Sequence, residues 1–291
     1  MPPREPKDLE RWLESVIIDF VTASPKNNLA SHKEEQAFDV PLVGFSKGDD
    51  PLYESYKELV GPYHWTPKEI FSLAFPDSRV DSSELTVISW ILPQTAATKK
   101  DNRKESFYPA ERWARAKTYG EAMNVKLRAH LVEALKREGY DAVAPLLFGQ
   151  YEMKKSDRYV LASTWSERHA AHAGGLGTFG LCDGLITPKG KAMRAGSVVA
   201  RIEVPPTPRP YDNHYAYCLF LAQGTCGRCI SRCPVGAITE AGHDKLKCHA
   251  HLRPTTEDHI KSEFRFDGYS CGLCQTGVPC ESRIPVKSDL E

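Results

Sequence analysis

The chain has 291 residues, with 38 basic and 38 acidic side chains, a formal net charge of zero and 41% hydrophobic residues. Zero net charge argues against a nucleic-acid-binding stripe and against binding to anionic membranes. No apolar run reaches the roughly 18 to 20 residues that span a bilayer, so no membrane partner is expected. Residues Met1 to Leu9 contain neither a signal-peptide apolar core nor a twin arginine, which predicts a cytoplasmic protein.

Helices and strands are predicted to alternate through residue 204. The first element is an amphipathic helix from about Asp8 to Val21, in which apolar side chains recur at three- and four-residue spacing. Residues 24 to 83 are rich in proline, glycine and charge, and are expected to form short helices joined by loops. The apolar run from Leu85 to Leu92 is rich in β-branched residues and ends at Pro93, which indicates a buried strand.

A long helix is expected from about Pro109 to Glu138, with Gly139 in the position of a left-handed C-cap. Two strands should follow, at Tyr140 to Phe148 and at Gly196 to Val204. The expected inner face of the long helix consists of Ala116, Tyr119, Met123, Leu127, Leu131 and Leu135. Because regular patterning ends there, we expect a cofactor- and substrate-binding domain over residues 1–210 and a second domain over residues 211–291.

Eight of the nine cysteines lie in this second region. Cys226, Cys229, Cys233 and Pro234 have the C-x₂-C-x₃-C-P spacing that closes a bacterial ferredoxin run. The first ligand of such a run would fall on a glutamine here, and Cys218 is its natural replacement. The remaining candidate ligands are Cys248, Cys271, Cys274 and Cys280. Eight thiolates are the number that two four-iron clusters require.

The last cysteine of a run ligates the other cluster in two-cluster ferredoxins. That rule assigns one cluster to Cys218, Cys226, Cys229 and Cys280, and the other to Cys233, Cys248, Cys271 and Cys274. Two structural zinc sites are the alternative, since paired CxxC motifs are also typical of zinc, but the ferredoxin spacing favours iron. The ninth cysteine, Cys182, stands apart, and a lone cysteine is most often a small buried hydrophobe.

The segment Gly175-Leu-Gly-Thr-Phe-Gly180 matches the GxGxxG fingerprint of dinucleotide-binding proteins. That motif must follow a strand and open a helix, whereas these glycines follow a predicted helix at Trp165 to Ala173. The context therefore argues against a nicotinamide site. The glycines permit close approach of the backbone to a large ligand, or a tight helix-to-strand connection.

The order of these segments resembles the tRNA epoxyqueuosine reductase family and, more distantly, the catalytic core of corrinoid reductive dehalogenases. The resemblance covers roughly residues 85 to 285. It rests on a helix carrying Glu167-Arg168-His169-Ala170, the glycines that follow, a strand, and the eight-cysteine module. It implies an α+β fold, namely a nitroreductase- or reductive-dehalogenase-like α/β sandwich with a C-terminal bacterial-type two-[4Fe-4S] ferredoxin module.

The same resemblance implies a cobalamin bound base-off between the two domains, reduced by the nearer cluster. An external donor such as ferredoxin or flavodoxin would supply the electrons, and a flavin is a less expected alternative cofactor. The D-x-H-x-x-G signature of a histidine beneath cobalt is absent, since Asp212-Asn-His214 is followed by Tyr217, which fits the base-off mode. The residues expected along the cofactor are Arg168, Gly174, Gly175, Gly177, Thr178, Gly180, Gly196, Ser197 and Val198.

The chain also departs from the reductase pattern. The family carries a proton-donating aspartate seven residues before the arginine of its Glu-Arg pair, and this chain has Leu161 there. With zero net charge and no helical-repeat extension, we expect a small organic substrate and no tRNA. Candidate proton donors are Tyr119, Tyr159, His169 and His172, although Tyr119 could be plain packing and the histidines could cap their helix.

Two hypotheses of different classes follow. The first is a corrinoid-dependent reductase. The second is an electron-transfer or assembly protein without a corrinoid, in which residues 1–210 are a docking platform. A large cavity flanked by Gly175 to Gly180 and reaching a cluster would favour the reductase, and a packed interface there would favour the carrier.

Overall fold

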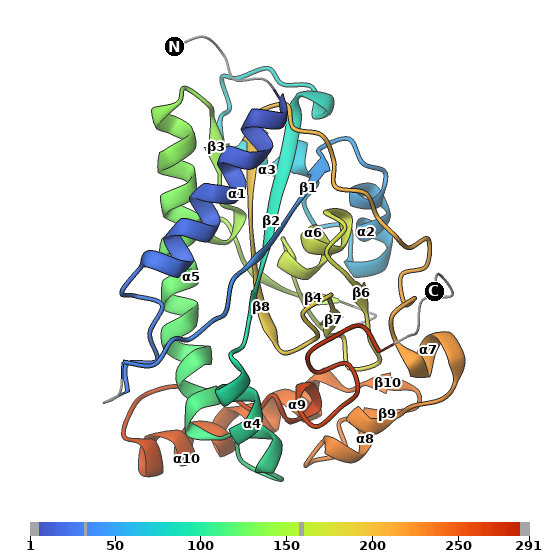
Figure 1. Cartoon of the computed structure of the whole chain (residues 1–291). Helices are drawn as coiled ribbons and strands as arrows, with labels where there is room; N and C mark the ends of the chain where they lie inside the picture. The colour runs from blue at the N-terminus through green and yellow to red at the C-terminus, as the bar shows by residue number, and fades with distance from the viewer. Residues whose placement is uncertain (1–5, 32–33, 157–159, 286–291) are drawn as a thin grey trace, which may run out of the picture.

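The computed structural model describes residues 6–31, 34–156 and 160–285, and its centre is a four-stranded antiparallel sheet with strand order β1-β2-β8-β3 (Figure 1). The two central strands, β2 (Leu85–Pro93) and β8 (Met193–Arg201), pair along their whole length. Strand β1 (Leu42–Lys47) pairs with β2, and β3 (Ala142–Val143) pairs with β8. Every residue of β2 is buried, which confirms the predicted buried strand.

Helices α1 (Pro6–Ala23) and α5 (Glu111–Arg137) lie side by side over one face of the sheet (Figure 1). Both helices confirm the sequence prediction within a few residues, and Gly139 has the expected left-handed φ of 85°. The predicted inner face of α5 is confirmed except at Tyr119, whose ring instead packs against Phe266 at 5.5 Å between centroids.

The opposite face of the sheet is covered by α2 (Leu52–Val60), α3 (Pro67–Ala74) and α6 (Glu167–Ala173). Helices α2 and α3 are the short helices predicted between residues 24 and 83, but the strand β1 in the same stretch was missed. Gly44 interrupts the apolar pattern of β1. A glycine is needed because an added Cβ would lie 2.2 Å from the carbonyl oxygen of Gly174.

Two predicted strands have different bounds in the structure. The strand expected at 140–148 is only the two-residue β3, because Pro145 cannot donate to the ladder and opens the 3₁₀ helix η2 (Pro145–Leu147). The strand expected at 196–204 begins three residues earlier, since β2 continues to Pro93 and offers it a partner. The hairpins β4–β5 (Met153–Ser156 and Val160–Ser163) and β6–β7 (Thr178–Phe179 and Leu185–Ile186) lie beside α6.

The cysteine-rich region lies at the lower end of the sheet in Figure 1 and consists of short elements. In chain order these are α7 (Leu219–Gln223), α8 (Arg228–Arg232), β9 (Ile238–Thr239), β10 (Gly242–His243), α9 (Lys245–Ala250), η3 (His251–Thr256), α10 (Glu257–His259), η4 (Ile260–Phe264) and η5 (Leu273–Gln275). The region also packs against α4 (Ala96–Lys104), where Arg232 donates hydrogen bonds to the carbonyl oxygens of Asn102 and Glu105. The division of the chain at residue 210 stays a prediction.

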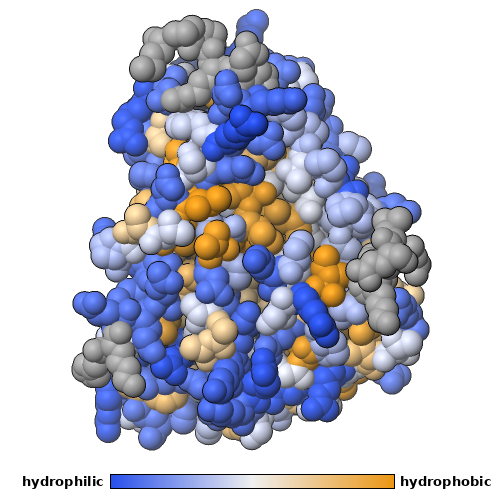
Figure 2. All heavy atoms as spheres, in the orientation of Figure 1, coloured by the Kyte–Doolittle hydropathy of each residue, from blue (hydrophilic) through white to orange (hydrophobic). Residues whose placement is uncertain are grey.

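The outer surface is mainly hydrophilic on the face shown in Figure 2, with one larger hydrophobic area at mid-height. Among the residues that the structure describes, no helix is both long and apolar enough to cross a membrane.

Candidate functional site

The cysteines of the predicted clusters gather at one end of the molecule. A cavity of about 220 Å³, here called the cysteine cavity, is lined by Cys233, Cys248, Cys271 and Cys274, which are the four residues that the ferredoxin rule assigned to one cluster. Three of the other four, Cys218, Cys229 and Cys280, meet in an adjoining apolar group. Cys226 is exposed. Within the described part of the chain no three His, Cys, Asp or Glu side chains are close enough to hold a single ion, and the ligand assignment stays a prediction.

Cys182 is buried as expected, but it is not isolated. It lies in the connection between β6 and β7 and lines the cysteine cavity. Its thiol contacts the thiols of Cys229 and Cys274, one from each predicted quartet. These contacts and the ammonium group of Lys191 lower the pKa of the Cys182 thiol well below its usual range.

Lys191 provides a buried positive charge at the same place. Its side chain is almost fully buried, and Nζ donates a hydrogen bond to Cys182 Sγ at 3.2 Å. No carboxylate in the described residues forms an ion pair with it. Burial alone would lower the pKa of Lys191, but the sulfurs of Cys182 and Cys280 raise it well above its ordinary value.

Two further cavities adjoin the cysteine cavity. The aromatic cavity, of about 140 Å³, and the polar cavity, of about 420 Å³, share a wall made by Met153, Ser163, Ser166 and Arg168. Arg168 also lines the cysteine cavity, and it is the one residue common to the three linings. The side chain of Arg168 therefore stands at the junction between the cysteines and the space available to a ligand.

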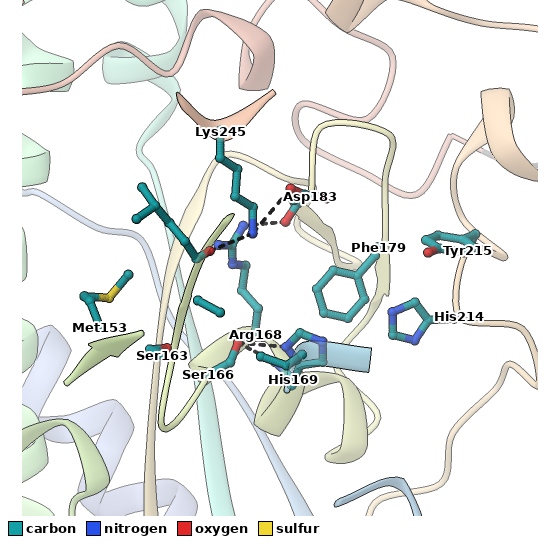
Figure 3. Close-up of a pocket in the computed structure, with 13 residues that line it drawn as sticks. Met153, Ser163, Ser166, Arg168, His169, Phe179, Asp183, His214, Tyr215 and Lys245 are labelled. Atoms are coloured by element: carbon teal, nitrogen blue, oxygen red, sulfur yellow. Dashed lines mark hydrogen bonds and ion pairs between the residues drawn. The ribbon is translucent and has the colours of Figure 1, made fainter. Parts of the chain in front are cut away.

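The aromatic cavity has aromatic rings on one side and charged groups on the other (Figure 3). The imidazole of His214 stacks on Phe179 at 4.4 Å, and His169 Nδ1 lies 2.8 Å from Ser166 Oγ. On the charged side Arg168 donates to the carbonyl oxygen of Asp183. Leu161 lines the same cavity, so the position expected to carry an aspartate in the related reductases presents an apolar side chain to it.

The Asp183 carboxylate is surrounded by cations. His243 Nδ1 lies 3.1 Å and Lys245 Nζ 3.8 Å from Asp183 Oδ2. Burial opposes the charged imidazole, but hydrogen bonds with Asp183 and Cys248 outweigh it and raise the pKa of His243 to about 9. Asp183 lines the aromatic cavity and His243 the cysteine cavity, so this pair joins the two walls.

The four candidate proton donors have different positions. His169 lines the aromatic cavity, and burial lowers its pKa well below the usual range, so it is neutral. His172 lies behind that cavity, where Tyr56 Oη is 2.9 Å from its Nδ1 and burial lowers its pKa to about 3. Tyr119 packs against Phe266, and Tyr159 lies outside the described residues.

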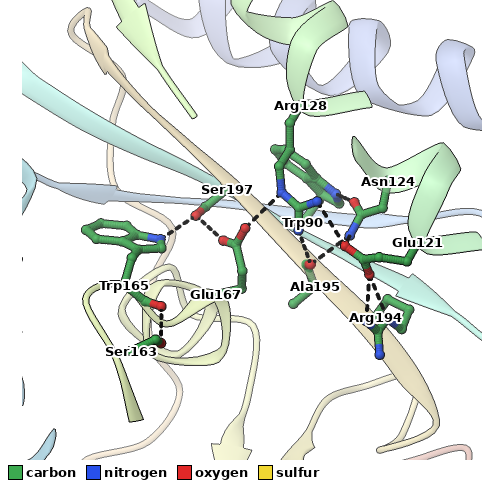
Figure 4. Close-up of polar contacts among 10 residues, drawn as sticks. All are labelled: Trp90, Glu121, Asn124, Arg128, Ser163, Trp165, Glu167, Arg194, Ala195 and Ser197. Atoms are coloured by element: carbon green, nitrogen blue, oxygen red, sulfur yellow. Dashed lines mark hydrogen bonds and ion pairs between the residues drawn. The ribbon is translucent and has the colours of Figure 1, made fainter. Parts of the chain in front are cut away.

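A buried ion network forms the far wall of the polar cavity (Figure 4). The guanidinium of Arg128, with 1% of its side chain exposed, pairs with Glu167 at 2.9 Å and with Glu121 at 3.1 Å. Glu121 also pairs with Arg194 at 2.6 Å, and Glu167 accepts a hydrogen bond from Ser197. Because Glu167 is the first residue of α6, the network fixes the helix that carries Arg168 and His169.

The glycine-rich segment is packed against other parts of the chain. An added Cβ would lie 2.8 Å from the Pro208 oxygen at Gly175, 2.2 Å from the Ile186 oxygen at Gly177 and 2.4 Å from the Trp90 ring at Gly196. The open alternative of a tight helix-to-strand connection is what the structure has, since α6 ends at Gly174 and β6 begins at Thr178.

The other residues expected along the cofactor have structural partners. Val198 lies in the core beneath α5, and Thr178 Oγ1 accepts a hydrogen bond from the Tyr217 backbone. Gly174 contacts Gly44, and Gly180 closes the β6–β7 turn by a backbone bond to Gly184. None of these residues is in the three linings described above, whereas Arg168 is in all of them.

Sequence reasoning missed the charged groups at the junction, namely Asp183, Lys191, His243 and Lys245. They come from segments far apart in the chain and share no motif. One signal was present, because Asp183 and Lys191 lie close in sequence to Cys182, in a short stretch between two glycine-containing turns.

Comparisons with known proteins show similarity in sequence and in fold. No protein-family model matches the chain. The epoxyqueuosine reductase of Bacillus anthracis is 31% identical over 120 residues, which cover 39% of this chain and only 29% of that enzyme. A crystal structure of an epoxyqueuosine reductase with a modified tRNA-Tyr stem loop matches 95% of this chain and 66% of that one, with a TM-score of 0.51 and 17% identity, which shows a common fold. A catabolic reductive dehalogenase matches at a TM-score of 0.49 and 14% identity. The expected resemblance is confirmed. This chain is similar to epoxyqueuosine reductases in sequence over about two-fifths of its length and in fold over nearly all of it. The low sequence identities fit a paralogue.

Proposed function

We propose that this protein is an iron–sulfur reductase that passes single electrons through two [4Fe-4S] clusters to a base-off cobalamin and so reduces a small organic substrate. One observation carries the proposal. The cysteine cavity, lined by the four cysteines assigned to one cluster, meets the aromatic and polar cavities at Arg168. Electron-carrying ligands and a space for an organic ligand are therefore neighbours.

The cysteine cavity fits an iron–sulfur cluster in its donor chemistry. Iron in such clusters is held by soft thiolates and is tuned by hydrogen bonds to sulfur. The backbone N–H of Ala237 donates to Cys233 Sγ at 3.1 Å, and Gly272 adopts a left-handed φ of 68° inside the CxxC turn. The buried ammonium of Lys191 supports the same assignment, because a buried charge needs a partner of opposite sign and its partners in the described part of the chain are cysteine sulfurs.

The space around Arg168 is the proposed cofactor and substrate site. Cobalamin bound there would supply a strongly reducing cobalt centre. In the residues of this chain, Arg168 and Lys245 offer hydrogen-bond donors to polar groups of a ligand, while Phe179 and His214 offer flat apolar surface. The glycines contribute indirectly, since they let β6 and the segment after β8 lie close together at the edge of this site.

His169 is the proton donor that we propose among the four candidates. It is the only one of the described candidates that lines the aromatic cavity. Its imidazole is neutral, so with Nδ1 engaged by Ser166 it acts through Nε2–H, which donates a hydrogen bond to the substrate atom that gains negative charge. Leu161 cannot take this role, so the chemistry of the site differs from that expected for the related reductases.

The substrate that we propose is small, with no action on tRNA. The solved relative that carries a tRNA stem loop runs against this part of the proposal, because it shares the fold. The neutral charge of this chain and Leu161 support it. A gel-shift assay with the unmodified anticodon stem loop of tRNA-Tyr gives a direct test, in which binding at micromolar protein would refute the proposed substrate class.

An electron carrier without a corrinoid is the second candidate. The packed glycine segment supports it, since Gly175 and Gly177 contact protein rather than a cavity. The cofactor would then be absent, and the clusters would serve a partner protein directly. An external donor such as ferredoxin or flavodoxin is proposed in either case.

Anaerobic purification followed by iron and cobalt analysis separates the candidates. The reductase predicts about eight irons per chain and, after reconstitution with cobalamin, about one cobalt with an EPR signal that changes on reduction. About eight irons per chain without cobalt binding would favour the electron carrier. Arg168→Met should weaken cobalamin binding, and Arg11→Met, which changes an exposed arginine on α1, is the matched control.

A further inference from the structure

Lys191 is held in place by the backbone around it. Its backbone N–H donates to the carbonyl oxygen of Cys280 at 2.8 Å. Gly190 lies so close to Glu281, the residue after Cys280, that an added Cβ would be 2.2 Å from the Glu281 oxygen. The lysine stem packs over Gly184, where an added Cβ would lie 2.7 Å from Lys191 Cδ. The ammonium group is therefore directed into the protein by packing on two sides.

That ammonium group lies beside Cys182, which contacts one cysteine from each predicted quartet. Lys191 Nζ donates to Cys182 Sγ at 3.2 Å, and Cys182 contacts Cys229 of one quartet and Cys274 of the other. Cys280 is also close enough to interact with the lysine charge. No other buried cation in the described residues faces sulfur from both sets, since Arg128 faces carboxylates and Lys99, on α4, lies near the Glu281 carboxylate.

We propose that Lys191 is a positioning residue that would raise the reduction potentials of both clusters, because it places a buried positive charge beside Cys182, which contacts one cysteine of each quartet. This inference rests on the proposed function, because it requires clusters on the eight cysteines. Reduction adds one negative charge to a cluster, and a nearby cation favours the reduced state more than the oxidised state. Net charge and hydrogen bonds to sulfur are the recognised controls of these potentials.

The same geometry gives Cys182 its role. Each quartet already supplies four thiolates, so Cys182 is not needed as a ligand. Its sulfur instead links the lysine to Cys229 and Cys274, so that one charge acts on two clusters. Lys191 and Cys182 would thus act together on both clusters.

The test is EPR-monitored redox titration of the anaerobically reconstituted full chain. Lys191→Gln keeps a donor for Cys182 but removes the charge. We expect the ratio of reduced to oxidised cluster at a fixed potential to fall at least tenfold, a shift of about 59 mV for a one-electron couple. Lys191→Arg keeps the charge and should keep both reduction potentials close to the wild-type values. Lys189→Gln, two residues away and exposed, is the matched control and should leave both potentials unchanged.

Cys182→Ala separates the linking role from ligation. Iron content should stay at about eight per chain, because the eight predicted ligands remain in place. Loss of iron in Cys182→Ala would make this residue a ligand and overturn the inference, as would wild-type potentials in an iron-replete Lys191→Gln protein. A wild-type chain that binds no iron would instead refute the proposed function itself, so the two failures are distinguishable.

Discussion

Replacing Arg128 tests whether the buried ion network holds the site together. Arg128 pairs with Glu167 and Glu121 and donates from Nη2 to the Ala195 carbonyl oxygen at 3.1 Å. In Arg128→Met, Glu121 keeps Arg194, but Glu167 is left largely buried, and the Ser197 hydroxyl is its one remaining partner among the described residues. Breaking a buried pair by removing one member costs about 3–5 kcal/mol, and we expect a loss in this range at pH 7.

The pH dependence of that loss identifies its cause. Burial already raises the pKa of Glu167 in the wild-type protein, and losing Arg128 raises it further. A carboxyl group whose pKa is higher in the folded state than in the unfolded state destabilises the fold as pH rises from the unfolded pKa through the folded pKa. The deficit of Arg128→Met should therefore be largest at pH 7 to 8 and shrink towards pH 5.

Urea unfolding of the anaerobic protein, followed by tryptophan fluorescence between pH 5 and pH 8, measures this deficit. Arg201→Met is the control, because Arg201 pairs with Glu84 at the surface and such pairs contribute about 0–1 kcal/mol. Adding Glu167→Gln to Arg128→Met should recover much of the loss at pH 7, since the amide carries no charge. A deficit below about 1 kcal/mol, or one that does not shrink in acid, would refute this account of the network.

Three further changes have expected outcomes. Cys226→Ala should lose one cluster, and iron content that stays at about eight per chain would contradict the ligand assignment. Gly177→Ala should unfold the β6–β7 region in urea well before the wild type, because its Cβ would lie 2.2 Å from the Ile186 oxygen, whereas Gly149→Ala, with no atom within 4 Å, should be tolerated. His64→Phe should reduce the loss of stability on going from pH 6.5 to pH 4. Burial lowers the pKa of His64 to about 4, so the unfolded state takes up the proton first, and an acid melt as steep as that of the wild type would contradict this.

The sequence predicted the elements whose signal is local. The apolar spacing of α1 and α5 predicts amphipathic helices, and the continuous apolar run of β2 predicts a strand buried on both faces, because burial leaves a local pattern in the sequence. Strand β1 left no such pattern, since Gly44 is there to meet Gly174, a residue 130 positions later. Tyr119 was misplaced for the same reason, since its partner is distant in the chain. Its position on α5 suits the core, but its ring packs against Phe266.

The site shows the same division. The cysteine spacing indicated a quartet that the structure gathers around one cavity, because the order of ligands in a ferredoxin run is a local sequence pattern. The charged groups at Arg168 could not be found in this way. Asp183 and Lys191 lie in the connections before and after β7, and Lys245 begins α9, so their proximity depends on the tertiary fold.

That connection also explains how one short turn serves two cavities. Cys182 and Asp183 are neighbours in the chain, yet Cys182 lines the cysteine cavity and Asp183 the aromatic cavity. The reversal of direction needs Asp183 in the left-handed region, with φ at 57°, which costs a residue with a side chain about 1–2 kcal/mol. Glycine at this position would relieve that strain but would remove the carboxylate beside His243 and Lys245. The strain is tolerated because the carboxylate holds β10 and α9 against the β6–β7 turn, while the carbonyl oxygen of Asp183 accepts a hydrogen bond from Arg168 and keeps it at the junction of the three cavities.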